Sequence, residues 1–300
     1  MYLNEKSWEV IQEDRYITDN AITNFLDIYA AVKKNYPRIE VYIPEGWTIY
    51  LCSKDYSIEK WFSSADIEYK RLYLLFVQKA IRYNKEEEYE VSFEGKMFYG
   101  GTEAYLNSSF ILSICLDDNW KKSNIECKFY SLPDNEEKDI SLKNVFCKEQ
   151  LECLLIKEIL DRENSIKVNS YDELWRRREE FFPHLEFCPS VKDNLDLLEM
   201  FYLSQVVRKL AELESYCVKH TGERFEPSYL TKVTPESKAT MEKYKDKHIF
   251  MDISGVKHIA SWHLRFTGIP GRIFFIPEYK QDCILVCYIG KKLPNVKYHA

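Results

Sequence analysis

The most informative segments of this 300-residue chain are WHLRFTGIPGRIFF at residues 262–275 and ILVCYIGKK at residues 284–292. Both are rich in β-branched and aromatic residues, and glycine and proline interrupt the first where a turn is expected. They predict strands over residues 258–266, 272–276 and 283–289, connected through residues 268–271 and 278–282. The C-terminal region is therefore predicted to contain an antiparallel meander.

Basic side chains recur along this predicted sheet. Side chains alternate between the two faces of a strand, so His263 and Arg265 point to the same side. If the strands pair as a meander, further basic residues and a tyrosine can converge there, namely Arg272, Lys291, Lys292 and Tyr298. Cleavage of RNA needs cations to hold the phosphate, a base for the 2′-hydroxyl and an aromatic ring to orient a nucleotide. The pattern therefore predicts an RNA-cleaving site that needs no metal ion.

The same residues resemble the C-terminal half of the RelE toxins, which are ribonucleases of bacterial toxin–antitoxin modules. RelE has two basic residues around one apolar residue on a strand, an arginine that begins the next strand, a glycine followed by paired basic residues, and a tyrosine near the C-terminus. The matching residues here are His263, Arg265, Arg272, Lys292 and Tyr298. RelE has lysine at the position of His263 and arginine at that of Lys292, so basic character is retained and the division of acid and base roles stays open.

This resemblance implies an endoribonuclease in which the 2′-hydroxyl attacks the adjacent phosphate and leaves a 2′,3′-cyclic phosphate or its hydrolysed 3′-phosphate. His263 is the implied base or proton shuttle, because an imidazole with a pKa near 6.5 can be neutral at cytoplasmic pH. Arg265, Arg272 and Lys292 are implied to hold the phosphate and stabilise charge, and Tyr298 to position the nucleotide. We predict further RNA contacts from Lys291 and Lys297, and no cofactor.

The resemblance also implies partners and a setting. RelE toxins often act on messenger RNA in the ribosomal A site, so RNA and the ribosome are the expected partners and arrest of translation the expected outcome. A toxin–antitoxin module or a bacterial defence system against phage is the expected setting. The implied fold of residues 184–300 is two helices followed by an antiparallel sheet.

The helices expected before the sheet are visible in the sequence. Apolar residues from Leu203 to Cys217 recur with i, i+3, i+4, i+7 spacing, which predicts a helix with one continuous apolar face. Gly222 lies beyond its expected end, where the chain is predicted to reverse. Another helix precedes this one, which gives the order of elements of the RelE family. Residues 221–257 are longer than the family leads us to expect.

The first part of the chain mixes helix and strand signals. We predict helices over residues 65–83 and 148–160, and strands over residues 89–93 and 110–115 with a turn at Gly100-Gly101. The capping-box pattern from Ser170 to Glu173 starts a connecting helix that ends at Pro183. The predicted fold class is therefore α+β, with an N-terminal α+β domain over residues 1–183 and a RelE-like domain over residues 184–300.

Charge is distributed unevenly between these two predicted domains. The whole chain has 42 Lys and Arg against 48 Asp and Glu, and a net charge of −6 argues against nucleic-acid binding. Residues 184–300 hold 17 basic and 14 acidic residues, a net charge of +3, whereas residues 1–183 hold 25 and 34, a net charge of −9. The mildly basic domain suits a local RNA site better than tight non-specific DNA binding. The acidic domain is predicted to regulate the other or to bind an antitoxin or another protein.

The cysteines and the apolar segments indicate the cellular compartment in which the protein is expected. Nine cysteines are scattered singly without a C-x-x-C pair, which indicates reduced thiols rather than a disulfide framework. No apolar run reaches the roughly 18 uncharged residues that a membrane-spanning helix needs, and the first residues do not form a signal peptide. We therefore expect a cytoplasmic protein without a membrane partner.

Three alternatives remain open at this point. The RelE-like sheet could be a non-catalytic module that binds RNA or a protein in a defence complex. Glu94-Gly95-Lys96 matches the E-x-K pattern of metal-dependent nucleases, which would place a nuclease in the N-terminal half. Cys217 and His220 supply two residues of metal-ligating type at a helix end.

Overall fold

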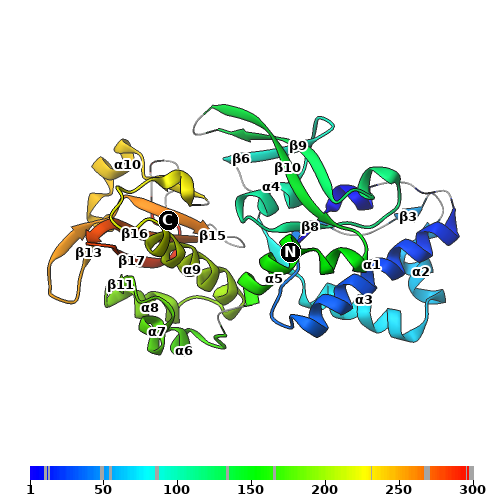
Figure 1. The fold of residues 1–300 in the computed structure, drawn as a ribbon, viewed down its shortest axis with the longest axis horizontal. Coiled ribbons are helices and arrows are strands. Elements are labelled where there is room, and N and C mark those ends of the chain that lie inside the picture. Colours follow the sequence, from blue (N-terminus) through cyan, green and yellow to red (C-terminus); the bar gives the residue numbers. More distant parts are fainter. Residues whose placement is uncertain are drawn as a thin grey trace. The chain divides into compact units, whose positions relative to one another are not determined.

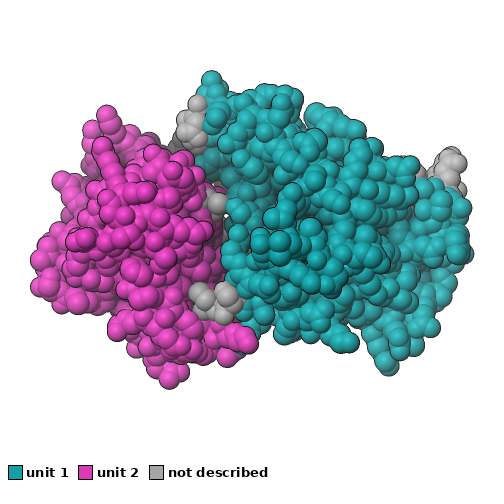
Figure 2. Space-filling model, viewed as in Figure 1, with its two compact units in different colours: residues 1–165 teal, residues 166–300 magenta. Residues whose placement is uncertain are grey.

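The computed structural model describes residues 1–300 apart from 10, 11, 13, 48–50, 54–55, 85–87, 133–134, 165–166, 231, 267–270, 295 and 297–300. The chain forms two compact units, residues 1–165 and residues 166–300 (Figure 2). Both combine helices with β-sheet, which confirms the predicted α+β class. The boundary is earlier than predicted, because Tyr171, Leu174 and Phe182 are buried in the core of the second unit. Within the described part of the chain, no helix is long and apolar enough to cross a membrane.

The first unit is built on an eight-stranded mixed sheet (Figure 1). Its strands, in spatial order, are β5 (Ile81–Tyr83), β2 (Tyr42–Pro44), β1 (Tyr2–Leu3), β8 (Phe110–Leu112), β10 (Glu136–Val145), β9 (Asn124–Ser131), β6 (Tyr89–Phe93) and β7 (Lys96–Met97). Neighbours from β5 to β10 in this order are parallel, and neighbours from β10 to β7 are antiparallel. A separate two-stranded sheet pairs β3 (Leu51–Ser53) with β4 (Tyr56–Ser57).

Helices cover both faces of the eight-stranded sheet. They are α1 (Arg15–Asn35), α2 (Ile58–Ser64), α3 (Ile67–Lys79), α4 (Tyr99–Leu106) and α5 (Leu154–Asn164), with the 3-10 helices η1 (Glu5–Trp8), η2 (Asp118–Trp120) and η3 (Lys148–Glu152). Side chains of α1, α3 and α5 share one core with Leu3 and Leu112, whereas α4 shares another with Tyr2 and Ile111. Because successive strand residues point to opposite faces, the two cores lie on opposite sides of the sheet.

The sequence predictions for this unit are partly correct. The helix predicted over residues 65–83 is α3, but its last residues form β5, and the helix predicted over residues 148–160 is divided between η3 and α5. The predicted strands are present as β6 and β8. The turn predicted at Gly100-Gly101 is wrong, because both glycines lie in the first turn of α4. A Cβ atom at Gly100 would overlap the carbonyl oxygen of Leu3, so glycine is needed there for close packing of α4 on β1.

The second unit begins with helices that share one core. They are α6 (Tyr171–Arg176), α7 (Arg178–Phe181), α8 (Ser190–Asp196), η4 (Met200–Tyr202) and α9 (Leu203–Lys219). The predicted cap is confirmed, since the Ser170 hydroxyl accepts the Glu173 N–H at 3.0 Å. The apolar face predicted for residues 203–217 is buried along α9. Gly222 has a φ of +74°, as expected where the chain reverses after a helix.

The sheet of the second unit contains the predicted meander. Its strands, in spatial order, are β11 (Leu185–Phe187), β17 (Cys283–Lys291), β16 (Gly271–Lys280), β15 (Trp262–Phe266) and β12 (Val233–Pro235). β15, β16 and β17 pair antiparallel in chain order. The sheet is not wholly antiparallel, because β11 pairs parallel with β17. The segments between these two strands include α8 and α9, which supply the long crossover that a parallel pair needs.

The long segment between α9 and β15 folds into short elements. They are η5 (Pro227–Tyr229), β12, α10 (Lys238–Lys243), η6 (Lys245–His248), β13 (Ile249–Met251) and β14 (Lys257–Ile259). β12 adds an edge strand beside β15, a position where Pro235 is tolerated because one side of the strand needs no ladder. β13 and β14 pair with each other as a separate hairpin.

Candidate functional site

The meander brings three of the predicted site residues together. His263 and Arg265 occupy alternate positions of β15 and therefore share a face. Arg272 on β16 lies directly opposite Arg265, and Gly290 on β17 lies directly opposite Arg272. The next row of the same face is His263, Phe274 and Tyr288. The predicted convergence of His263, Arg265 and Arg272 on one face is therefore present.

His263 lies in a buried, positively charged environment. Its exposed fraction is 3%, and its Nε2 lies 3.3 Å from the Thr234 hydroxyl. Burial, followed by the positive charges of Arg272 and Arg265, lowers the pKa of His263 well below its usual value. Glu236 Oε1 lies 3.8 Å from Nδ1 of His263. Because the lowered pKa favours a neutral imidazole, this approach is not an ion pair at neutral pH.

The two arginines concentrate positive charge on the sheet. Both side chains are buried, with exposed fractions of 5% for Arg265 and 6% for Arg272. Arg265 Nη2 lies 3.4 Å from Thr234 Oγ1, and Arg272 Nη1 donates to the carbonyl oxygen of Gly271 at 3.0 Å. Like charges placed directly opposite each other weaken strand pairing. Such an arrangement has the charge that would hold an anion such as a phosphate.

The remaining predicted residues do not all join this face. Lys291 is exposed at the end of β17 and lies opposite Gly271, so strand alternation places it on the other face. Lys291 therefore does not converge on the face of Arg272 as predicted, and its RNA contact stays a prediction. Lys292 follows directly after β17 and is half-buried. Lys297 and Tyr298 lie outside the described residues.

A glycine beside the site has a steric cause. Gly290 is the glycine that precedes the paired lysines in the predicted motif. A Cβ atom at this position would overlap the ring of Tyr288, whose hydroxyl donates to the carbonyl oxygen of Lys291 at 2.8 Å. The Tyr288 ring therefore folds over Gly290 and occupies the site face next to Arg272. No side chain larger than glycine fits without displacing that ring.

Sequence analysis missed two side chains beside His263. His248 is completely buried, and its ring lies 4.9 Å from that of Phe274, which is 5.1 Å from the ring of His263. Glu236 follows β12 and reaches His263 as described above. Burial lowers the pKa of His248, and the negative charges of Glu236 and Asp246 oppose this shift. The clustering of all six histidines in the second part of the chain was the available signal, but their distances depend on the folding of residues 231–261.

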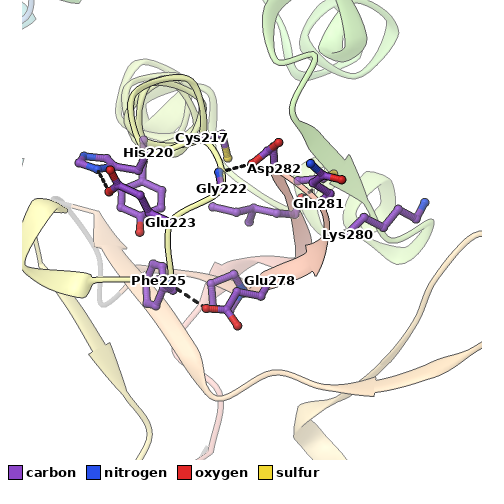
Figure 3. A pocket seen from close by; sticks show the side chains of 13 residues that line it. Cys217, His220, Gly222, Glu223, Phe225, Glu278, Lys280, Gln281 and Asp282 are labelled. Atoms are coloured by element: carbon purple, nitrogen blue, oxygen red, sulfur yellow. Dashed lines mark hydrogen bonds and ion pairs between the residues drawn. The ribbon is translucent and has the colours of Figure 1, made fainter.

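A pocket of about 360 Å³ lies elsewhere in the second unit, between the end of α9 and the turn from β16 to β17 (Figure 3). Two acidic side chains of the pocket accept hydrogen bonds from the backbone. Asp282 accepts the N–H of Gly222 at 2.6 Å, and Glu278 accepts the N–H of Phe225 at 2.8 Å. His220 contacts Glu223 at 2.8 Å. The pocket is at the opposite ends of β16 and β17 from Arg272 and Gly290.

The two sequence patterns read as metal sites have structural explanations. Glu94 and Gly95 both have positive φ, +50° and +74°, and form the two-residue turn between β6 and β7. The E-x-K pattern is thus the exposed tip of a hairpin. Cys217 contacts the carbonyl oxygen of His184 through its sulfur, whereas His220 contacts Glu223. Among the residues that the structure describes, no group of three or more His, Cys, Asp or Glu side chains is placed to hold a metal ion.

A buried carboxylate in the first unit also escaped sequence analysis. Glu5 follows β1, and its side chain accepts the N–H groups of Tyr99 at 2.5 Å and Gly100 at 3.0 Å, at the start of α4. Burial raises the pKa of Glu5 to about 7, although these hydrogen bonds act in the opposite direction. The carboxylate satisfies backbone donors that a helix start leaves free. Its role here is structural.

A chain of three polar side chains lies beside Glu5. Asn4 Nδ2 donates to the Ser113 hydroxyl at 2.7 Å, which donates to Asn144 Oδ1 at 2.6 Å. Asn144 Nδ2 donates to the carbonyl oxygens of Trp120 and Lys122 at 2.9 and 2.8 Å. Each of the three side chains is buried, and each has hydrogen-bond partners.

Comparison with known proteins gives no information on the function of this chain. No protein-family model, curated protein or solved structure matches the chain. The interpretation of the site therefore depends on the geometry of the second unit and on the sequence pattern that this geometry carries.

Proposed function

We propose that the second unit binds RNA at the face carrying His263, Arg265 and Arg272 and cleaves it without a metal ion. The observation that carries this proposal is the placement of two arginines directly opposite each other, one row away from a neutral histidine. The two guanidinium groups supply charge for a phosphodiester, and the histidine supplies a base. Helices followed by an antiparallel meander are also the arrangement that the resemblance to RelE implies.

The proposed reaction is a transesterification. His263 accepts the proton of a ribose 2′-hydroxyl, the O2′–P bond forms, and the bond from phosphorus to the 5′ oxygen breaks. The leaving 5′ oxygen takes a proton from solvent, and the products are a 2′,3′-cyclic phosphate and a 5′-hydroxyl. Arg265 and Arg272 neutralise the charge that develops on the phosphate oxygens. Because the pKa of His263 is lowered, the base stays neutral as the pH falls from 8 to 6.5.

The proposed biological role is that of a bacterial toxin or defence effector in the cytoplasm. Its substrate would be messenger RNA, and the ribosome would be the partner that presents it. The acidic first unit would restrain the second or bind an antitoxin or another protein.

The test uses the purified full chain with end-labelled messenger RNA, with and without ribosomes, in the presence of a chelator. We expect cleavage that leaves 2′,3′-cyclic phosphate ends and persists with the chelator. Arg272→Ala should lower the rate about 100-fold or more, since loss of one group that stabilises transition-state charge has that order of effect. Arg224→Ala, which removes an exposed arginine from the loop after α9, is the matched control and should cleave like the natural chain.

Two outcomes would overturn the proposal. The first is the absence of cleavage in every mixture, including those with ribosomes. The second is RNA binding without cleavage that Arg272→Ala abolishes, which would leave the non-catalytic RNA-binding module as the function of this face. Mapping the cut positions on the messenger would then show whether cleavage depends on codons in the ribosome.

A further inference from the structure

The segment inserted between α9 and β15 lies over the proposed site. Phe250 on β13 points at the sheet, and its ring centre is 6.5 Å from that of Phe274 and 6.2 Å from that of Tyr288. His248 at the end of η6 packs on Phe274 from the same segment. Phe274 and Tyr288 are the row that contains His263. Residues 245–259 therefore cover this row, and we call them the cover.

Burial of the site agrees with this position of the cover. RNA must touch His263 to be cleaved by the proposed reaction, yet the exposed fraction of this residue is 3%. Arg265 and Arg272 are nearly as buried. In this conformation, none of the three side chains is exposed to a polynucleotide at the surface.

The acidic side chain of Asp252 connects the cover to the sheet. Asp252 Oδ1 accepts the N–H groups of Ser254 and Val256 at 2.8 and 3.0 Å, which shapes the turn of the hairpin. Its Oδ2 lies 2.7 Å from His258 Nε2 and accepts the Tyr279 hydroxyl at 2.9 Å. Because Tyr279 belongs to β16, this last hydrogen bond joins the hairpin to the sheet.

The hairpin of the cover is weakly supported. β13 and β14 are three residues long and, in the described part of the chain, pair with each other alone. Its outward side chains are aliphatic and exposed by 39–77%, namely Ile249, Met251, Ile253, Val256 and Ile259. An isolated two-stranded hairpin is marginal in water, so its position depends on the inward contacts of Phe250 and His258. Segments with so few buried contacts open locally at low free energy.

His248 adds a reason for the cover to open. It is completely buried, and neither ring nitrogen makes a hydrogen bond of normal length and angle with a described residue, although the backbone of Ala260 lies close enough to raise its pKa. A buried polar atom without a partner costs free energy that water would restore on exposure. The closed state thus contains an unfavourable interaction at the point where the cover meets the sheet.

We infer that residues 245–259 are an autoinhibitory cover that closes the His263 row and opens to admit RNA. The inference rests on the proposed function for the identity of the ligand, but the closing and opening can be measured without it. Phe250 and the bond from Tyr279 to Asp252 hold the cover shut. The first unit, or a partner of the chain, would then act by shifting the balance between the closed and open states.

The first measurement is the rate at which diethyl pyrocarbonate modifies each histidine of the full chain, followed by mass spectrometry. We expect His263 and His248 to react at least tenfold more slowly than the partly exposed His184. Phe250→Ala should speed both reactions about tenfold. Tyr279→Phe, which removes one hydroxyl, should speed them a few-fold, and it serves if Phe250→Ala does not fold. Ile253→Ala, on the exposed outer side, is the matched control and should react like the natural chain.

The second measurement is the affinity for a fluorescent single-stranded RNA with 2′-O-methyl groups, which cannot be cleaved. Phe250→Ala should bind it about tenfold more tightly than the natural chain. Equal labelling rates of His263 and His184 in the natural chain would contradict the inference of a cover. Slow labelling of His263 in both Phe250→Ala and Tyr279→Phe would contradict it as well. Faster labelling without RNA binding in any form would support the cover and overturn the proposed RNA function.

Discussion

Two buried polar clusters of this protein are built on opposite principles. In the first unit, Asn4, Ser113 and Asn144 form a hydrogen-bonded chain in which each side chain both donates and accepts. In the second unit, both ring nitrogens of His248 and Nδ1 of His263 lack a hydrogen bond of normal length and angle to a described residue, although backbone groups of Ala260 and Ser261 lie close to these rings. The first cluster satisfies its polar atoms, whereas the second leaves some of them unsatisfied.

This difference suggests that the first cluster serves stability and the second serves activity. A satisfied buried network adds rigidity and costs little, because its hydrogen bonds replace those with water. Burying the imidazole of His263 beside two arginines lowers stability, and such costs concentrate at functional sites. Replacing a member of the first cluster should therefore damage stability alone. Replacing a member of the second should damage activity and leave stability equal or higher.

The largest effect is expected for His263→Gln. The rate of RNA cleavage should fall about 100-fold or more, which is the usual contribution of a general base. The free energy of unfolding should change little, since the amide is uncharged like the neutral imidazole and can keep a hydrogen bond to the Thr234 hydroxyl. Urea unfolding measures the stability of the variant, and initial rates on labelled RNA measure its activity. A variant that lost stability but kept its cleavage rate would contradict the contrast between the two clusters.

Glu5 predicts a pH dependence that belongs to the first unit. Its pKa is about 7 in the folded protein and 4.5 as the reference value, so folding favours the protonated form. Its contribution to stability is fully present below pH 4.5 and is lost as the pH rises through 7, by about 3 kcal/mol. Urea unfolding followed by tryptophan fluorescence suits this test, because four of the six tryptophans lie in residues 1–165.

The control for this prediction is Glu5→Gln. Its unfolding free energy should lose this pH dependence, because the amide does not titrate between pH 4.5 and 8. An equal slope in the natural chain and the variant would show that another group is responsible.

Asn144→Ala tests the satisfied cluster directly. The variant loses the bonds to Ser113 and to the carbonyl oxygens of Trp120 and Lys122, so the first unit should lose about 2 kcal/mol of stability. Asn124→Ala, at an exposed position on β9, should change the unfolding free energy by less than about 0.5 kcal/mol. RNA cleavage by the folded variant should be unchanged. If the cleavage rate fell by more than the loss of folded protein accounts for, the first cluster would also affect activity, and the contrast between the two clusters would be wrong.

The smallest expected effect is a loss of stability of the second unit at acidic pH. Burial lowers the pKa values of His248 and His263 below 6.5, so folding favours their neutral forms. Their contribution is fully present above pH 6.5 and is lost as the pH falls through the lowered values. The protection factors of the β15 and β16 amides, which compare their hydrogen exchange with the intrinsic rate at each pH, should therefore fall in acid. His248→Phe should weaken this fall, and an identical pH dependence of the protection factors in the variant would exclude His248 as its source.

Several elements could be predicted from the sequence because local patterns determine them. The apolar repeat from Leu203 to Cys217 predicts α9, since only one face of that helix can be buried. The alternation in residues 262–266 predicts β15 and places His263 and Arg265 on one side. Gly222 marks the end of α9 because its positive φ favours a residue without a Cβ.

Other features escaped prediction because they depend on distant contacts. The Gly100-Gly101 pair is typical of a turn, but Leu3 from the chain start lies so close that only glycine fits at the beginning of α4. The unit boundary was placed too late because Tyr171 and Leu174 carry no local sign of the core in which they are buried. Lys291 was assigned to the site by proximity in sequence, whereas its register puts it on the other face.

The sequence by itself determined the chemical types at the candidate site and the strands that carry them, because alternation and turn residues act over a few positions. Tertiary structure alone decided that Arg265 lies opposite Arg272, that His248 and Glu236 approach His263, and that residues 245–259 cover this row. These relations depend on strand register and on the path of the long segment between α9 and β15. Both are set by packing between residues far apart in the chain, which no local pattern records.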